Sequence, residues 1–279
     1  MARSTTVTGR IGRLTLVGYI SVVVLLVIFP AAVAVLGTFS GTTDPIASLQ
    51  RLIDGQWTID YVVSAFDRAP LLQQGLNSVL VTLAQTALQL VTSLLAAYAL
   101  VFGRLRRFAG VLLAVFLVTM MIPSETTIVA NYLTIRSFGL YDTLTAVFIP
   151  YAASAYSIFL LRQAFLSFPT EIREAALLDG TGPLRFLMQF LIPLCRPAVV
   201  TVIVTSAIAA WNGYLWPLIV TESPESRTAQ VGVASLADSS VTDIGSLLAG
   251  TVLVSLPTVF LVIFGQRNLV KGLTQGANR

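Results

Sequence analysis

The side chains that usually carry catalysis or metal binding are scarce in this sequence. Its 279 residues include no His and a single Cys, Cys195. Imidazole acid–base chemistry, His metal sites and an intrachain disulfide are therefore excluded. We expect no catalytic residues and no metal site. The polar residues that could act fall into two sets: carboxylates in mid-chain, and amides and aromatic residues within long apolar segments.

The carboxylates of the first set lie in the segment EIREAALLDGTGP, residues 171–183. Glu171 suits the first turn of a helix, where a negative charge is favoured. Gly180 supplies the left-handed conformation that commonly ends a helix. Thr181 and Pro183 predict the cap and first turn of a second helix. The segment therefore predicts two short helices joined by a sharp turn.

The first of these helices carries an apolar stripe. Ile172, Ala175 and Ala176 follow one another at helical spacing, and the alanines allow close approach of another surface. Two interpretations are open: a connector lying on a membrane surface, or a docking helix for the groove of a soluble partner. Pro193 and Pro197 bracket the return of the chain to its apolar regions.

The second set begins with Gln85 and Gln89, which are four residues apart and share one face of a predicted helix. One interpretation is hydrogen bonding between helices. The other is a polar wall along a solute pathway. The sequence leaves both open.

A further group lies in AAWNGYLWPLIV, residues 209–220. Trp211 and Tyr214 suit an aromatic belt at a membrane interface. With Asn212 between them, they also suit the binding of sugar hydroxyls and apolar sugar faces. Glu125, beside a proline, is either an interfacial residue or part of an outer vestibule.

The elements that must position these residues are membrane spans. The chain is 56% hydrophobic and only 11% charged, against about 25% charged in soluble domains. Spanning helices need about 20 mostly apolar residues, and six intervals free of charge are long enough. We expect the third span to extend past Glu125 or to be less tilted than the others. The predicted spans are 14–38, 76–101, 108–127, 143–163, 197–220 and 245–266.

The basic residues set the orientation of these spans. Cytoplasmic loops are enriched in Lys and Arg. Arginines and Lys271 crowd the N-terminus, the 102–107 turn, the 162–196 loop and the C-terminal tail. The alternate loops are acid-rich. Both termini are therefore expected inside, and residues 171–183 are expected in the cytoplasm.

The predicted spans are nearly free of ionisable residues. Ion-coupled carriers usually place one deep in the membrane. A membrane-embedded enzyme would need a catalytic cluster. An ion-coupled secondary transporter for a small polar solute remains the alternative hypothesis, but an external energy source is the simpler interpretation.

The motif EAALLDG, residues 174–180, followed by FLIP, residues 190–193, resembles the EAA loop of permease subunits in binding-protein-dependent ABC importers. The spacing of that loop is kept, with Phe190 in place of its usual aliphatic residue and Ile192 in place of the Leu before Pro193. The resemblance covers roughly residues 70–275. It is greatest to the carbohydrate branch, the maltose- and glycerol-3-phosphate-type permeases, through FGLYDTLTAVFIPYAAS, WNGYLWPLIV and QRNLVKGL.

The resemblance implies an all-α protein of a prokaryotic cell membrane. Residues 1–75 would hold the first span and an outer loop, 76–268 the core permease domain with the EAA loop at 165–195, and 269–279 a cytoplasmic tail. The implied partners are a second homologous permease, two ATPase subunits, an external solute-binding protein and membrane lipid. Nucleic acid is not expected. ATP and Mg²⁺ would bind the ATPases, since this chain lacks a P-loop pattern.

The resemblance also implies roles for individual residues. Glu174 would be the main polar contact to an ATPase, and Ala175 and Ala176 the packing face. Gly180 would form a hinge-like turn, with Asp179 as a cap or salt-bridge partner. Pro193 completes the motif.

The substrate follows less directly. The stretches FLLRQAFLSFPTEIREAALLDGTGPLRF, residues 159–186, and WNGYLWPLIV, residues 211–220, look most like the glycerol-3-phosphate subgroup, which favours glycerol-3-phosphate or a glycerophosphodiester. Phosphate binding favours Arg or Lys, yet no basic residue lies in the middle of a predicted span. A neutral sugar, which would suit the group at 211–214, remains the alternative.

Overall fold

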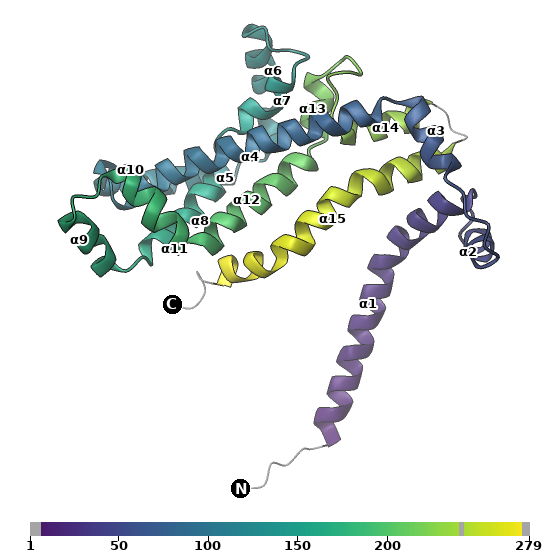
Figure 1. The fold of residues 1–279 in the computed structure, drawn as a ribbon, viewed down its shortest axis with the longest axis horizontal. Coiled ribbons are helices and arrows are strands. Elements are labelled where there is room, and N and C mark those ends of the chain that lie inside the picture. Colours follow the sequence, from purple (N-terminus) through teal and green to yellow (C-terminus); the bar gives the residue numbers. More distant parts are fainter. Residues whose placement is uncertain (1–6, 240–242, 275–279) are drawn as a thin grey trace. The chain divides into compact units, whose positions relative to one another are not determined.

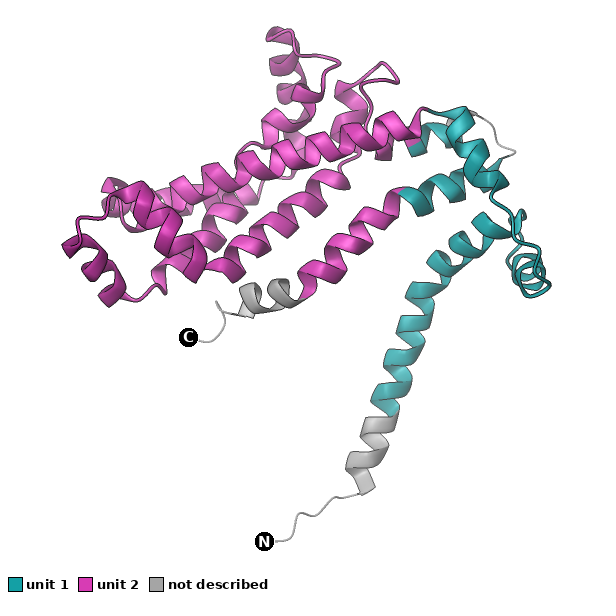
Figure 2. Ribbon diagram, in the orientation of Figure 1, with its two compact units in different colours: residues 1–69, 233–253 teal, residues 70–232, 254–279 magenta. Residues whose placement is uncertain are grey.

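The computed structural model describes residues 7–239 and 243–274, and within these ranges every regular element is a helix. The chain packs as two compact units, residues 1–69 with 233–253 and residues 70–232 with 254–279 (Figure 2). The contacts between residues place the first boundary between these two units after Ala69. The functional division of the chain after residue 75 stays a prediction.

The first unit begins with a long apolar helix. Leu25, Leu26 and Val27 of this helix are 68%, 69% and 71% exposed. Such a surface is unfavourable in water and suits lipid or another apolar helix. Asp44 caps the next helix by accepting hydrogen bonds from two backbone N–H groups. The helices of this unit are α1 (Val7–Ser40), α2 (Pro45–Ile53) and α3 (Asp60–Arg68), with parts of α14 (Ala229–Ser239) and α15 (Ile244–Thr274) (Figure 1).

The second unit is built around α4, which packs along α8 and α12 (Figure 1). Leu161, Phe165, Leu191 and Val202 are completely or almost completely buried in the core of this unit. Besides the remainder of α14 and α15, its elements are α4 (Leu71–Val101), η1 (Arg104–Phe108), α5 (Ala109–Met120), η2 (Ser124–Thr127), α6 (Ile128–Ser137), α7 (Leu144–Phe148), η3 (Ile149–Tyr151), α8 (Ala155–Leu166), α9 (Thr170–Leu178), α10 (Pro183–Phe186), the π-helical η4 (Leu187–Leu191), α11 (Ile192–Leu194), α12 (Arg196–Trp211) and α13 (Leu215–Val220).

Three helical stretches are long and apolar enough to cross a membrane: Thr15–Ser40, Leu71–Val101 and Ile244–Gln266. They match the first, second and sixth predicted spans. Three further pairs of helices pass the same test only as bent pairs, so the described residues offer up to six spans. The other three predicted spans are therefore not continuous helices.

The third predicted span, 108–127, is broken. Its helix ends at Met120, and the chain bends by 90° before Ser124–Ser137. Pro123 lacks an N–H and disfavours helical geometry in the residue before it. The expectation of a helix continuing past Glu125 is therefore wrong, and the alternative of a less tilted span stays a prediction.

The fourth and fifth predicted spans are also interrupted. Within 143–163, the helices Leu144–Tyr151 and Ala155–Leu166 meet at 46°. The predicted span 197–220 divides into α12 and α13, separated by residues 212–214. Pro217 has no N–H to donate to the Gly213 carbonyl, and its ring crowds that group, so a helix does not run through this point.

Candidate functional site

The segment resembling an EAA loop begins with a short helix, as predicted. α9 starts at Thr170, directly after Pro169, and Glu171 lies in its first turn. Pro169 precedes the helix, with a φ of −59° and a ψ of 127°. The carboxylate of Glu171 thus lies near the exposed backbone N–H groups of the helix start, where it is favourable.

The turn after α9 has the geometry of a glycine-terminated helix end. Gly180 has a φ of +68°. The Thr181 N–H donates to the Ala176 carbonyl at 2.9 Å, and the Gly180 N–H donates to the Leu177 carbonyl at 3.1 Å. These two bonds define a Schellman motif. The left-handed glycine predicted at this position is confirmed.

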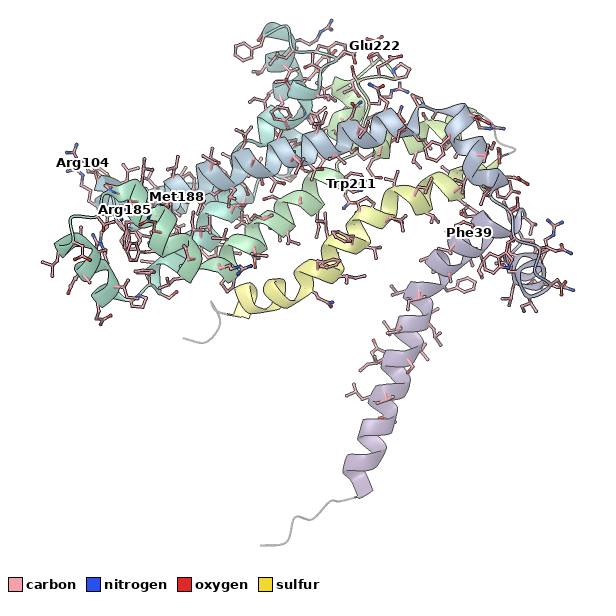
Figure 3. All side chains as sticks on the ribbon, in the orientation of Figure 1. Phe39, Arg104, Arg185, Met188, Trp211 and Glu222 are labelled. Carbon is pink, nitrogen blue, oxygen red and sulfur yellow. The ribbon has the colours of Figure 1, made fainter. Side chains whose placement is uncertain are left out.

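The second helical piece starts at Pro183, as predicted, but its cap differs. Gly182 precedes it without a side-chain capping bond, whereas Thr181 belongs to the end of α9. The prediction of Thr181 as the cap is therefore wrong. Arg185 and Met188 project from this piece (Figure 3). Pro193 is exposed, and an 87° bend separates Pro183–Leu194 from α12.

α9 has two faces with different environments. Ile172 and Ala176, which is 3% exposed, pack into the chain's own core. Glu174 and Ala175 are exposed on the other side. The predicted stripe is therefore divided, because two of its members contact this chain. Ala176 is corrected from a partner-facing residue to an inward-facing one.

The apolar surface that α9 does expose comes from residues the sequence analysis left out. Leu178 is 89% exposed and Leu177 61% exposed. Both precede the Gly180 turn. Together with Glu174 and Ala175 they form the exposed surface of α9, which is available to another chain.

The polar face of α4 is largely buried and forms hydrogen bonds to other segments of the chain. Gln89 donates from Nε2 to the Tyr151 carbonyl at 2.8 Å. Asn77 donates to the Glu225 carbonyl at 2.6 Å. For Gln89, this supports hydrogen bonding between segments over a solute-facing role.

Gln85 lies one turn from Gln89 and is also buried. The hydroxyl oxygens of Thr82 and Thr86 are buried beside it without a hydrogen-bond partner among the described residues. Buried polar atoms are normally paired. This stretch of α4 therefore has unused hydrogen-bonding capacity.

The polar residues around the break between α12 and α13 differ in their exposure. Trp211 is buried and donates from Nε1 to the Val254 carbonyl at 2.9 Å (Figure 3). Asn212 is exposed, and its Oδ1 accepts from Thr258 Oγ1 at 3.2 Å and from Gln230 Nε2 at 3.3 Å. Tyr214 is 44% exposed. Trp211 is thus corrected from a solute-facing residue to a packing residue.

Glu125 is exposed in η2, at the bend that follows α5. Its Oε1 accepts a hydrogen bond from Ser124 at 3.0 Å. Its position outside a continuous helix suits a surface carboxylate. A role in a vestibule stays a prediction.

Asp142 is a positioning residue that carries no recognisable motif in the sequence. It has a φ of 59°, which Asp tolerates better than most residues. Its Oδ1 accepts from the backbone N–H groups of Glu222 and Ser223 at 2.8 and 3.1 Å. Burial raises the pKa of Asp142, but the bonds from Glu222 and Ser223 outweigh that effect and lower it overall. The carboxylate thus joins two loops distant in sequence.

No group of three or more His, Cys, Asp or Glu side chains comes together in the described part of the chain.

Residues 89–275 match the family described as the binding-protein-dependent transport system inner membrane component. This is more than half of the chain, and it contains both the α9 turn and the α12 break. The protein belongs to this family of transport permeases and is an inner-membrane protein.

Curated relatives agree with this assignment. The chain is 32% identical over 269 residues to the lactose transport system permease protein LacG of Rhizobium radiobacter, covering 96% of this chain and 97% of LacG. It is 37% identical over 201 residues to the sn-glycerol-3-phosphate transport system permease protein UgpE of Agrobacterium fabrum, covering 71% of each. A UgpE from Yersinia enterocolitica is 33% identical over 258 residues, covering 90% of this chain and 92% of that protein.

A solved structure shares the fold. A chain of a bacterial ABC transporter that imports the acidic polysaccharide alginate superposes with a TM-score of 0.80 at 21% identity. The match covers 95% of this chain and 99% of that one. The likeness extends the fold assignment to nearly the whole sequence.

Proposed function

We propose that this chain is one of two permease subunits in an ATP-driven importer of a carbohydrate-class solute. It would form half of the translocation pathway, with both termini in the cytoplasm. Two ATPase subunits would bind ATP and Mg²⁺ below it, and an external binding protein would deliver the solute. The named relatives serve lactose and sn-glycerol-3-phosphate transport, which supports this class.

The observation that carries the proposal is the construction of α9. One face is buried in the chain's own core, and the other exposes Glu174, Ala175 and two leucines. A helix anchored on one side can transmit a displacement applied to the other. We assign coupling to Glu174, Ala175, Asp179, Gly180 and Pro193, with Ala176 as the buried anchor.

The proposed solute pathway uses the neutral polar groups of the second unit. Gln85 and Asn212 offer amide donors and acceptors, and Tyr214 offers an exposed ring. Glu125 is a candidate for an outer vestibule. Such groups suit hydroxyl-rich solutes, whether a sugar or the glycerol part of glycerol-3-phosphate.

The experiment is ATP-dependent uptake into proteoliposomes containing the chain with its companion permease, ATPase and binding protein. Lactose and glycerol-3-phosphate would be offered separately. Glu174→Ala removes one charge-assisted contact worth about 1.5–3 kcal/mol, so ATPase affinity should fall roughly 10- to 100-fold. Gly180→Pro should abolish coupling, because proline cannot adopt a φ of +68°.

Glu225→Ala, which removes an exposed carboxylate from another loop, is the matched control and should leave uptake unchanged. Normal uptake by both coupling variants would overturn the proposed role of α9. Uptake that needs no ATP and stops when an ion gradient is collapsed would favour the ion-coupled alternative.

A further inference from the structure

Phe102 lies where α4 meets the segment that carries α9. It ends α4, and its backbone N–H donates to the Tyr98 carbonyl at 2.8 Å. Its ring centroid lies 5.8 Å from that of Phe186 and 6.5 Å from that of Phe168, in both cases edge to face. A third contact, to Phe165 of α8, is 6.4 Å long. One side chain thus touches α8, α10 and the linker after α8.

Phe102, Phe168 and Phe186 form a closed triangle of edge-to-face pairs. The third side, between Phe168 and Phe186, measures 5.6 Å. Aromatic pairs in this geometry are more favourable than the burial of their area alone would make them. Because the three rings come from different segments, the triangle fixes both ends of the α9–α10 loop to α4.

α9 itself reaches the same ring. The Arg173 guanidinium carbon lies 4.9 Å from the Phe102 ring centroid, within the range of a cation–π interaction. Arg173 adjoins Glu174, whose side chain is exposed on α9. The exposed docking surface and the aromatic triangle are therefore joined through adjacent residues of one short helix.

α4 carries the connection further. It runs from Leu71 to Val101, about 45 Å at 1.5 Å per residue. Along it, Gln89 bonds to the Tyr151 carbonyl and Asn77 to the Glu225 carbonyl. A movement of the Phe102 end of α4 would therefore reach the segments around Tyr151 and Glu225, which α4 holds through these hydrogen bonds. Figure 1 shows α9 and α10 at one end of α4.

We propose that Phe102 is the positioning residue through which displacement of α9 moves α4, so that removing its ring uncouples ATP hydrolysis from transport. The inference rests on the proposed function, because it requires an ATPase to act on α9. It assigns to Phe102 no contact with the solute or with the ATPase.

The test compares Phe102→Ala with Phe102→Tyr in the reconstituted importer. Two quantities are measured: ATPase binding to the permease, and solute molecules moved per ATP hydrolysed. For Phe102→Ala we expect binding within about threefold of the wild type, and a transport-to-hydrolysis ratio lowered about tenfold or more. Phe102→Tyr keeps the ring, so its transport-to-hydrolysis ratio should stay close to that of the wild type. Phe260→Ala, which breaks the Phe260–Phe264 pair on α15, is the matched control and should leave the ratio unchanged.

A second variant keeps the test decisive if Phe102→Ala fails to insert. Arg173→Gln removes only the cation–π contact and should lower the ratio severalfold, with the aromatic triangle intact. An unchanged ratio in Arg173→Gln together with an unchanged ratio in Phe102→Leu would overturn the inference. If Glu174→Ala weakens ATPase binding while these ratios stay normal, the proposed function stands and only the role of Phe102 fails. If Glu174→Ala has no effect on binding or uptake, the proposed function fails first.

Discussion

At the scale of single residues, Gly232 and Gln74 of the second unit approach each other closely. A Cβ at position 232 would occupy the space of the Gln74 carboxamide. Gln74 is almost fully buried, and its Nε2 donates to the Pro224 carbonyl at 3.2 Å. The carboxamide therefore cannot rotate away without breaking this bond.

Gly232→Ala should destabilise the protein by about 1–3 kcal/mol, the usual cost of overpacking a buried site. The measurement is thermal unfolding in detergent, followed by intrinsic fluorescence. Gly75→Ala is the matched control, since a Cβ there meets nothing within 4 Å. Gly75 lies inside α4, so alanine should stabilise by up to about 1 kcal/mol. Equal melting temperatures for the two variants would contradict this account of Gly232.

At the scale of elements, the first unit contains a cluster that joins α3 to the start of α15. Asp243 Oδ2 accepts from Ser246 Oγ at 2.6 Å and from Ser64 Oγ at 3.2 Å. Arg68 Nη2 lies 3.0 Å from the same oxygen. The Ser246 N–H donates to Oδ1 at 3.1 Å, as in a helix cap. The Ser246 hydrogen bond is the main cause that holds the Asp243 pKa below its ordinary value of 3.8, and burial opposes it.

This cluster should make stability depend on pH in a defined direction. Because the folded-state pKa is lowered, the contribution of the Asp243 carboxylate is fully present above pH 3.8 and is lost as the pH falls below it. Asp243→Asn should lower the free energy of unfolding by about 1–2 kcal/mol near neutral pH. This difference in unfolding free energy between variant and wild type should become smaller towards about pH 3. Chemical unfolding at several pH values measures this difference. Asp67→Asn, which changes an exposed carboxylate on α3, is the control and should leave the unfolding free energy close to that of the wild type. If the difference in unfolding free energy for Asp243→Asn did not change with pH, the proposed role of the cluster would be contradicted.

The sequence was sufficient to locate apolar segments but not to decide where they bend. Pro123 lies at a break and Pro217 lies in the first turn after one, yet α1 continues through Pro30 and α15 through Pro257. A proline always removes one N–H. Whether the helix ends depends on whether neighbouring groups satisfy the freed carbonyl. That is a property of tertiary packing, which apolar periodicity does not contain.

The same distinction applies to the candidate site. The Gly180 turn was predictable because its cause is local: glycine tolerates a positive φ. The inward direction of Ala176 was not, because periodicity defines a helix face without saying what covers it. The contacts of Phe102 with Phe168 and Phe186 join positions far apart in the sequence, so a single sequence gives no signal for them.

At the scale of the whole molecule, the two units share helices, since α14 and α15 contribute residues to both. Long intervals of the chain carry no charge, and the basic residues concentrate in alternate loops. Proteins with this pattern keep the basic loops in the cytoplasm. The proposed orientation therefore makes a prediction about which loops can be reached from each side of the membrane.

The single native cysteine makes this orientation measurable. Cys195 is buried, and Cys195→Ala provides a cysteine-free background. Ile46 and Leu178 are 80% and 89% exposed and lie in loops predicted on opposite sides. A membrane-impermeant maleimide added to intact cells should label Ile46→Cys and spare Leu178→Cys. Inverted vesicles should show the reverse, and detergent-solubilised protein should label at both positions as the control.

Addition of the ATPase should slow maleimide labelling of Leu178→Cys several-fold and leave labelling of Ile46→Cys unchanged, because only α9 is proposed to bind the ATPase. Labelling of Leu178→Cys in intact cells would place α9 outside the cytoplasm and remove it from the reach of any ATPase.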